Sequence, residues 1–307
     1  MKKLHQRYVS RRKGSFFKKS FVMILLIACI PGLLTGAGVY LFSAAKIEKE
    51  LQHLHENQVK RQISQIDDKL EGLEIMLSQL AYDPRLMNGL ADADLQTDFQ
   101  TTYKLSKSLF LLQDQNPLIH KVELFIQGKE PILLNPEYNG LTDRKILKAY
   151  HSLLEGGQNV YWKDMSGASS GMALVHKIPG GILEPFGALI LTLDERELGR
   201  LLESLSPYSK GTALLFHHNQ KPVSWSNRGK TNFESALKER LEKQKNPQGS
   251  FVMDWSGGAY SVSYGRMDRL NQEWTYVSAS PMSAITAPVL FLSKLIASVS
   301  IAGIVLA

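Results

Sequence analysis

The chain has 307 residues, a formal net charge of +7 and a single cysteine. Eight of its 36 lysines and arginines precede Ser20, where no acidic residue occurs, so the rest of the chain holds 28 basic residues against 29 acidic ones. This nearly neutral remainder argues against a nucleic-acid-binding face. The lone cysteine, Cys29, excludes an internal disulfide and a metal site built from several thiolates.

Residues 20–45 carry no charged side chain. A helix of this length measures about 39 Å, which exceeds the roughly 30 Å hydrocarbon core of a bilayer. We therefore predict a transmembrane helix at 20–45, and the basic tail 1–19 places the N-terminus in the cytoplasm. The alternative is a cleaved signal peptide ending near Ala45, although the apolar core of such a peptide is usually only ~7–15 residues long.

A second apolar stretch, 286–307, carries one charge, Lys294, near its outer end. It reads as a second transmembrane helix, but only thirteen residues follow Lys294, and a crossing needs about twenty residues in all. We expect the chain to be a fragment that stops inside this helix and lacks a cytoplasmic output part. The topology is that of a multi-pass cell-membrane protein in contact with the lipid bilayer, with residues 46–285 extracytoplasmic.

The region 46–115 is predicted to be mainly helical. A long helix over 46–82 carries apolar residues at alternating steps of three and four, which form a heptad seam: Val59, Ile63, Ile66, Leu70, Leu73, Leu77 and Leu80. A second short seam, offset by one residue, contains Ile47, Leu51 and Leu54. Two interpretations stay open: the helix pairs two copies in a homodimer, or it packs against its own domain.

Asp83-Pro84 is expected to end this helix, because proline removes a hydrogen-bond donor and fixes φ. A second helix is predicted at 94–113. Its expected apolar face consists of Tyr103, Leu105, Leu109, Phe110 and Leu112.

From residue 116 the apolar pattern alternates, which is typical of strands. A hairpin, a helix and three strands are predicted at 119–126, 131–134, 142–154, 159–163, 171–178 and 186–193. After a linker helix at 194–205, the same order returns at 211–217, 221–225, 231–244, 250–255, 259–265 and 274–280. We predict an α+β fold with two units, 116–193 and 194–285, each a five-stranded antiparallel sheet that the long helix helps to cover.

The segment from Phe186 to Asp194 with its following helix, and the segment from Tyr260 to Pro281 that leads into the second span, carry a family resemblance. With the anchor and the long helix, they resemble the double Cache (tandem PAS-like) extracytoplasmic sensor domains of bacterial receptors. The basic tail, with Arg11-Arg12-Lys13, most resembles that of membrane-bound AraC-type transcription regulators. In those proteins a helix-turn-helix DNA-binding domain follows the second span, so DNA binding is implied only through a domain outside this chain.

Two alternatives accompany this interpretation. The chain is the sensor part of a histidine kinase or a chemoreceptor, or it is a ligand-free anchored interaction protein.

We expect no enzyme activity, no cofactor and no metal site. His217 and His218 are adjacent, so their rings point to opposite faces of a strand, and His53 and His55 lack the i, i+4 spacing of a metal pair.

A small-molecule pocket is favoured instead, because in the resembled domains a ligand binds on the sheet of the membrane-distal unit. Aromatic side chains with one carboxylate and one ammonium suit a zwitterion or a sugar, and the candidate ligand-binding residues are Tyr138, Tyr161, Trp162, Lys163 and Asp164. Because Tyr161 and Trp162 are adjacent in a strand, at most one of them faces the ligand. The signature that some such domains use for amino acids, an arginine followed by Trp-Tyr, is absent.

Overall fold

The computed structural model describes residues 19–20, 23, 46, 49–84, 90, 95, 97–128, 131–135, 137–140, 143–165, 171–181, 183–208, 210–218, 222–225, 231–244, 246–287, 291, 294–295 and 298. The chain divides into two compact units, 1–54 and 55–307. In the first unit, residues 49–54 are helical. The two predicted spans, 20–45 and 286–307, lie almost entirely outside the described residues, and none of the helices described is long and apolar enough to cross a bilayer.

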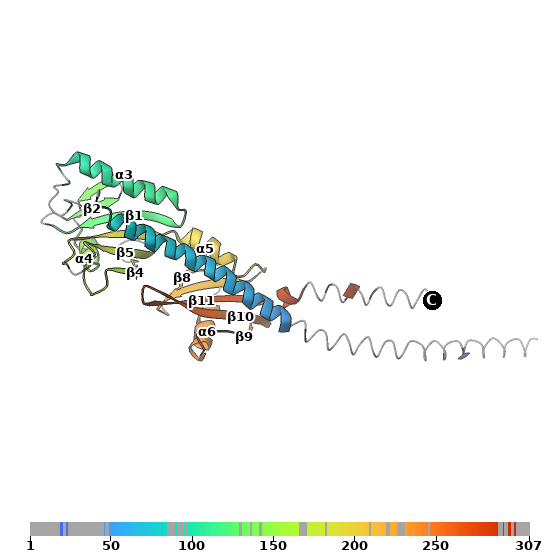
Figure 1. Cartoon of the computed structure of the whole chain (residues 1–307). Coiled ribbons are helices and arrows are strands. Elements are labelled where there is room, and N and C mark those ends of the chain that lie inside the picture. Colours follow the sequence, from blue (N-terminus) through green and yellow to red (C-terminus); the bar gives the residue numbers. More distant parts are fainter. Residues whose placement is uncertain are drawn as a thin grey trace, which may run out of the picture. The chain divides into compact units, whose positions relative to one another are not determined.

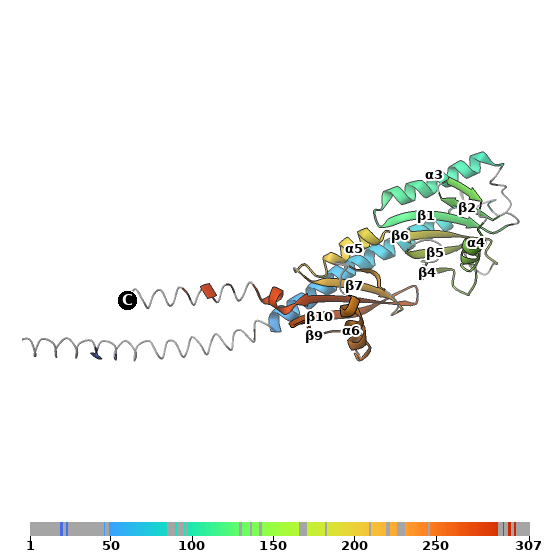
Figure 2. The ribbon, with the colours of Figure 1, turned by 180° about the vertical axis from the view of Figure 1, so that it is seen from behind.

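In the second unit, residues 55–81 are helical, and this long helix ends just before Asp83-Pro84, as the proline predicts. It runs along both sheets of the unit (Figures 1 and 2). Its seam residues from Val59 to Leu77 are at most 7% exposed and belong to one apolar core that also contains residues of both sheets. The seam over 59–77 therefore packs against its own unit, which decides between the two interpretations for this part of the helix.

The first sheet has six antiparallel strands in the order β3-β2-β1-β6-β5-β4. Their bounds are β1 Ile119–Ile126, β2 Ile132–Asn135, β3 Glu137–Gly140, β4 Val160–Asp164, β5 Met172–Ile178 and β6 Gly187–Leu193. The prediction of five strands was one short, because the segment of β3, Glu-Tyr-Asn-Gly, has the composition of a turn. It forms the edge of the sheet by pairing with β2.

The second sheet has five antiparallel strands in the order β8-β7-β11-β10-β9. Their bounds are β7 Thr212–His217, β8 Pro222–Trp225, β9 Gln248–Trp255, β10 Gly258–Arg269 and β11 Gln272–Pro281. This order repeats β2-β1-β6-β5-β4, so the predicted internal repeat is confirmed. β10 and β11 are longer than expected, since Leu270 and Asn271 adopt positive φ (54° and 59°) and close a two-residue hairpin turn.

Each face of the first sheet has its own cover. Alternate residues such as Leu124, Leu174 and Leu191 face the long helix and α3 (Phe99–Gln115). The intervening residues, among them Phe125 and Val175, face α4 (Arg144–His151). We call these the helix face and the α4 face. In the second half of the unit, α5 (Glu195–Glu203) joins the same core as the long helix, while α6 (Thr231–Glu242) covers the opposite face of the second sheet.

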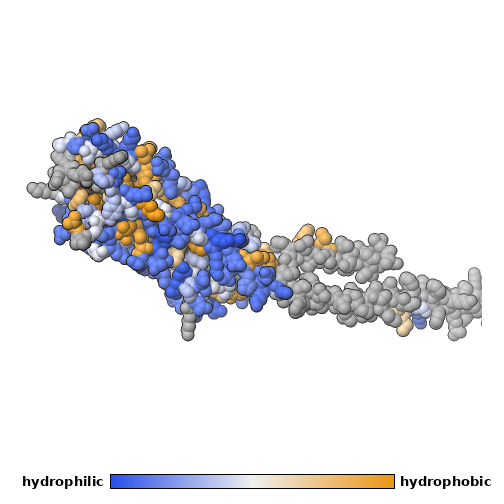
Figure 3. Space-filling view, viewed as in Figure 1, coloured by the Kyte–Doolittle hydropathy of each residue, from blue (hydrophilic) through white to orange (hydrophobic). Residues whose placement is uncertain are grey.

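The helix α3 starts at Phe99 and not at residue 94, because the Asp98 side chain accepts a hydrogen bond from the backbone N–H of Thr101 and so forms the N-cap. The predicted apolar face is correct for its leucines but wrong for Tyr103 and Phe110, which are 58% and 52% exposed. With Phe99, they form an exposed aromatic stripe. Figure 3 shows hydrophobic surface where α3 and the first sheet lie.

Candidate functional site

The α4 face of the first sheet carries a buried carboxylate. Glu123, on β1, is 1% exposed. Its Oε1 accepts hydrogen bonds from Lys121 Nζ (2.9 Å) and Asn135 Nδ2 (3.2 Å), and its Oε2 accepts one from the Tyr150 hydroxyl (3.0 Å). Burial raises the pKa of Tyr150, and the Glu123 carboxylate adds to this effect, so the hydroxyl stays a donor. These contacts tie α4, which carries Tyr150, to the sheet.

Beside this cluster lies an unsatisfied hydroxyl. Thr192, on β6, is fully buried, stands opposite Lys121 in the sheet register, and its Oγ1 has no hydrogen-bond partner among the described residues. Its other neighbour in the register, Ala173, is small. A buried polar atom without a partner costs stability, and no contact among the described residues offsets this cost for the Thr192 hydroxyl.

Two of the predicted ligand residues share the α4 face but already have partners in the protein. The Tyr161 hydroxyl donates to the backbone oxygen of Leu153 (2.6 Å), and Lys163 Nζ donates to Ser152 Oγ (3.1 Å). Burial raises the pKa of Tyr161, followed by the charge of Glu155. Both residues therefore hold the segment that follows α4.

A third residue of this face, Lys177, holds the same segment from β5. Its Nζ donates to the backbone oxygens of Glu155 and Gly156 at 2.8 and 2.7 Å. The ammonium also lies 6.0 Å from the centre of the Tyr161 ring.

Trp162 and Asp164 do not join this group. Trp162 is 1% exposed and lies on the helix face, as the alternation along β4 requires. Asp164 follows Trp162 by two residues along β4 and therefore lies on the same face of the sheet. Its negative charge opposes the lowering of the pKa of His217 in the second sheet. For Tyr138 the structure describes the backbone, in β3, and its side chain lies outside the described part. Tyr161 and Lys163 therefore lie on one face of β4 and Trp162 and Asp164 on the other, and a ligand contact through any of the five residues stays a prediction.

On the helix face, β4 enters a buried polar cluster shared by the long helix and both sheets. We call it the joint, and it consists of Glu74, Trp162, Arg269 and Gln272. Trp162 Nε1 donates to Glu74 Oε1 (2.8 Å), and Arg269 Nε donates to the same oxygen (3.1 Å) while its Nη2 contacts Glu74 Oε2. Glu74 and Arg269 are each 8% exposed, so both charges are removed from water and depend on each other.

Arg269 is surrounded by acidic residues of the long helix. Its Nη1 lies 3.2 Å from Asp67 Oδ1 and 3.6 Å from Glu71 Oε2. Burial alone lowers the pKa of Arg269, but Glu74, Asp67 and Glu71 outweigh it, and the pKa is raised above its usual value. The guanidinium therefore keeps its charge in this buried position.

Gln272 completes the joint by pairing with the edge strand of the other sheet. Its Nε2 donates to the Trp162 backbone oxygen (3.0 Å), and its Oε1 accepts from the Trp162 N–H (2.7 Å). The Trp162 and Trp274 rings meet edge to face at 5.5 Å, and His217 lies against Trp274 at 5.1 Å. Burial lowers the pKa of His217 to about 4, and the charge of His218 acts in the same direction.

Sequence reasoning missed the joint. Glu74 and Arg269 are 195 residues apart and belong to different predicted elements, so no local pattern pairs them. One feature of the sequence could have pointed to Glu74. It directly follows the seam residue Leu73, so its carboxylate lies at the edge of the apolar seam.

Solved structures show where this arrangement occurs. The extracellular domain of soHK1S-Z6, a protein assigned as a histidine kinase, is 19% identical, with 81% of this chain and 99% of that chain covered, at a TM-score of 0.53. That of vpHK1S-Z8, with the same assignment, is 11% identical, with coverages of 80% and 96% and a TM-score of 0.51. This chain has the double Cache fold.

A further structure with this fold is a domain of a sensory box/GGDEF family protein from Vibrio parahaemolyticus. It is 11% identical, with 78% of this chain and 99% of that chain covered, at a TM-score of 0.52. No protein-family model matches the chain, and no curated protein matches it. The likeness therefore establishes the fold, as the resemblance in the sequence implied.

Proposed function

We propose that the chain is the extracytoplasmic sensory part of a membrane-anchored bacterial signalling protein, and that it is not an enzyme. It binds a small polar molecule on the α4 face of the first sheet, beside Thr192. The observation that carries the proposal is the position of β4. Tyr161 and Lys163 hold the segment after α4 on one side of this strand, while Trp162 enters the joint on the other side.

This arrangement supports a mechanism for signal transfer. A ligand that displaces α4 or the segment after it moves Tyr161 and Lys163, and with them the strand β4. Because Trp162 contacts Glu74 and Gln272 through its side chain and its backbone, the displacement reaches the long helix and the second sheet together. The long helix precedes the second unit's sheets in the chain and follows the predicted span 20–45, so it is suited to carry the signal toward the membrane.

We further propose that the cytoplasmic output module is either an AraC-type DNA-binding domain or a histidine kinase. The basic tail favours an AraC-type regulator, while the extracellular domains of two proteins assigned as histidine kinases have the same fold, which favours a kinase. The reading frame beyond Ala307 tests both. An ATP-binding kinase module excludes the regulator, and two helix-turn-helix units exclude the kinase.

A ligand-free interaction protein is the second candidate, and the exposed aromatic stripe of α3 favours it. Phe99 and Tyr103 are 79% and 58% exposed, and their rings stack at 6.4 Å. Pairing of two copies through the short seam remains part of either proposal, and the exposure of Leu54 (54%) supports it.

Thermal unfolding of the chain in the presence of a small-metabolite library separates these candidates. The sensor proposal predicts that one chemical class raises the unfolding midpoint, and that Thr192→Val, which keeps the side-chain shape, weakens the effect. Ser108→Ala on α3, whose hydroxyl bonds to its own helix at Lys104, is the matched control. If no class stabilises the wild-type chain, the ligand-free candidate replaces the sensor.

A further inference from the structure

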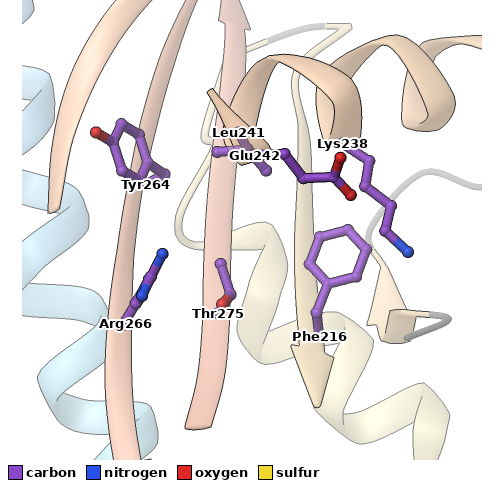
Figure 4. A pocket seen from close by; sticks show the side chains of 7 residues that line it. All are labelled: Phe216, Lys238, Leu241, Glu242, Tyr264, Arg266 and Thr275. Atoms are coloured by element: carbon purple, nitrogen blue, oxygen red, sulfur yellow. The ribbon is translucent and has the colours of Figure 1, made fainter. Parts of the chain in front are cut away.

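The second sheet has a pocket of its own, on the face that α6 covers. Figure 4 shows Phe216 from β7, Thr275 from β11, and Tyr264 and Arg266 from β10 on the sheet side. The last two turns of α6 close the other side with Lys238, Leu241 and Glu242. The hollow measures about 470 Å³ with the solvent at its open mouth included, and its enclosed part is far smaller. A single ring or a short chain is therefore the largest ligand body that it can cover.

The wall of the pocket is apolar. Phe216 and Tyr264 are 3% and 6% exposed and belong to the core between the second sheet and α6, and Leu241 packs against that core. The Tyr264 hydroxyl points away from Arg266 toward β9, where Gly249 leaves room for it. Tyr264 therefore offers its ring to the pocket, and an apolar ligand body finds carbon surface there.

The charged groups at or beside the rim are two cations, Arg266 and Lys238, and two carboxylates, Glu242 and Glu273. Arg266 Nη1 bonds to Glu273 Oε2 at 3.2 Å, but the two side chains are 44% and 42% exposed, so water weakens this pair and a competing carboxylate can replace Glu273. Lys238 makes no ion pair with any residue of the described part of the chain. Glu242 is the only acidic side chain among the lining residues described. A planar guanidinium with an ammonium across an apolar floor matches one carboxylate attached to an apolar body.

We infer that this pocket binds a small monocarboxylate with a single ring or a short aliphatic chain, and that it is a second ligand site, separate from the α4 face of the first sheet. The carboxylate bonds to Arg266, with Lys238 contributing charge. The ring or chain lies against Phe216, Tyr264 and Leu241.

Isothermal titration calorimetry of the 307-residue chain in detergent micelles tests this inference, with benzoate and pentanoate as ligands and benzamide as the neutral analogue. Both carboxylates are expected to bind at one site, and benzamide at least ~10-fold more weakly. Arg266→Gln is expected to weaken benzoate binding by roughly 10- to 100-fold. Arg240→Gln, which removes an exposed charge from α6 and not from the pocket lining, is the control and should leave binding unchanged.

Two further variants make the outcome decisive. Leu241→Trp fills the pocket with a larger side chain, leaves Arg266 and Lys238 unchanged, and should abolish binding. Thr192→Val should have no effect, because it alters the first sheet only. The inference is overturned if neither carboxylate produces binding heat up to about 10 mM, if Arg266→Gln binds benzoate like the wild type, or if Thr192→Val removes the binding. The first two outcomes leave the sensor proposal for the first sheet standing.

Discussion

Replacing Arg269 by methionine tests the joint by removing one partner of its buried ion pair. The substitution removes the hydrogen bonds to Glu74 and the contact with Asp67, and leaves the Glu74 carboxylate 8% exposed without its counter-charge. Breaking a buried ion pair from one side costs about 3–5 kcal/mol. The remaining hydrogen bond from Trp162 Nε1, at 2.8 Å, compensates part of this cost, so we expect a loss near the lower limit, about 3 kcal/mol.

In a chain of this size, such a loss lowers the thermal unfolding midpoint by roughly 6–12 °C, because each kcal/mol corresponds to about 2–4 °C. Circular dichroism of the chain in detergent measures it. Glu71→Gln is the matched control: the Glu71 side chain is 56% exposed and lies 3.6 Å from Arg269, so its loss should cost less than about 1 kcal/mol.

A double variant, Arg269→Met with Glu74→Met, separates pairing from packing. Because neither charge is then buried alone, the double variant should be destabilised by less than the sum of the single variants, with an interaction energy above about 1 kcal/mol. The reasoning is refuted if Arg269→Met is no more destabilising than Glu71→Gln, or if the two single effects simply add.

Two further predictions use the same unfolding assay. Because the pKa of His217 is lowered to about 4 in the folded protein, against about 6.5 when unfolded, its contribution to stability is present above pH 6.5 and is lost as the pH falls toward 4, by up to about 3 kcal/mol. His217→Gln should therefore flatten the fall in stability between pH 6.5 and 4, and an unchanged pH profile contradicts the assignment. Leu70→Ala, at a fully buried seam position, should cost about 2–5 kcal/mol, whereas Ile75→Ala, at a residue 51% exposed, should cost less than about 0.5 kcal/mol. Both effects should be independent of protein concentration, and a concentration-dependent loss for Leu70→Ala means that the seam pairs two copies instead.

Local patterns predicted most of the elements of this fold. The alternation over 119–126 gives β1 with its observed bounds, and Asp143 and Asp194 cap α4 and α5 close to the predicted starts. The repeated order of elements was sufficient to predict two sheets, and both have the same strand order apart from β3. The strand bounds and helix caps depend on residues close in sequence, which is why the sequence reveals them, whereas the pairing of β1 with β6 and of β7 with β11 was inferred only through the repeated order of elements.

Features that depend on distant contacts were missed or left open. Tyr103 and Phe110 look apolar on α3, yet both aromatic rings are exposed, and the buried residues of this helix are Leu105, Leu109 and Leu112. The seam of the long helix fits a dimer and a core equally well by spacing alone, and its burial at 0–7% decides for the core.

In the candidate site, too, local pattern predicted some features and distant contacts decided the others. The alternation of Tyr161 and Trp162 predicted that they face opposite sides, but only the fold shows what each one contacts. Tyr161 reaches the backbone after α4, and Trp162 reaches Glu74 and Gln272. The sequence therefore located the important strand, β4, without revealing its connection to the long helix.

Hydrogen–deuterium exchange of the whole chain, with and without a compound that stabilises it in the thermal screen, tests whether the joint transmits ligand binding to the long helix. With the compound bound, we expect slower exchange in α4 and β4 and also in residues 66–77 of the long helix, with the effect on the helix reduced in Arg269→Met. Slowing that stays within the first sheet, or that reaches the helix equally in Arg269→Met, contradicts transmission through the joint.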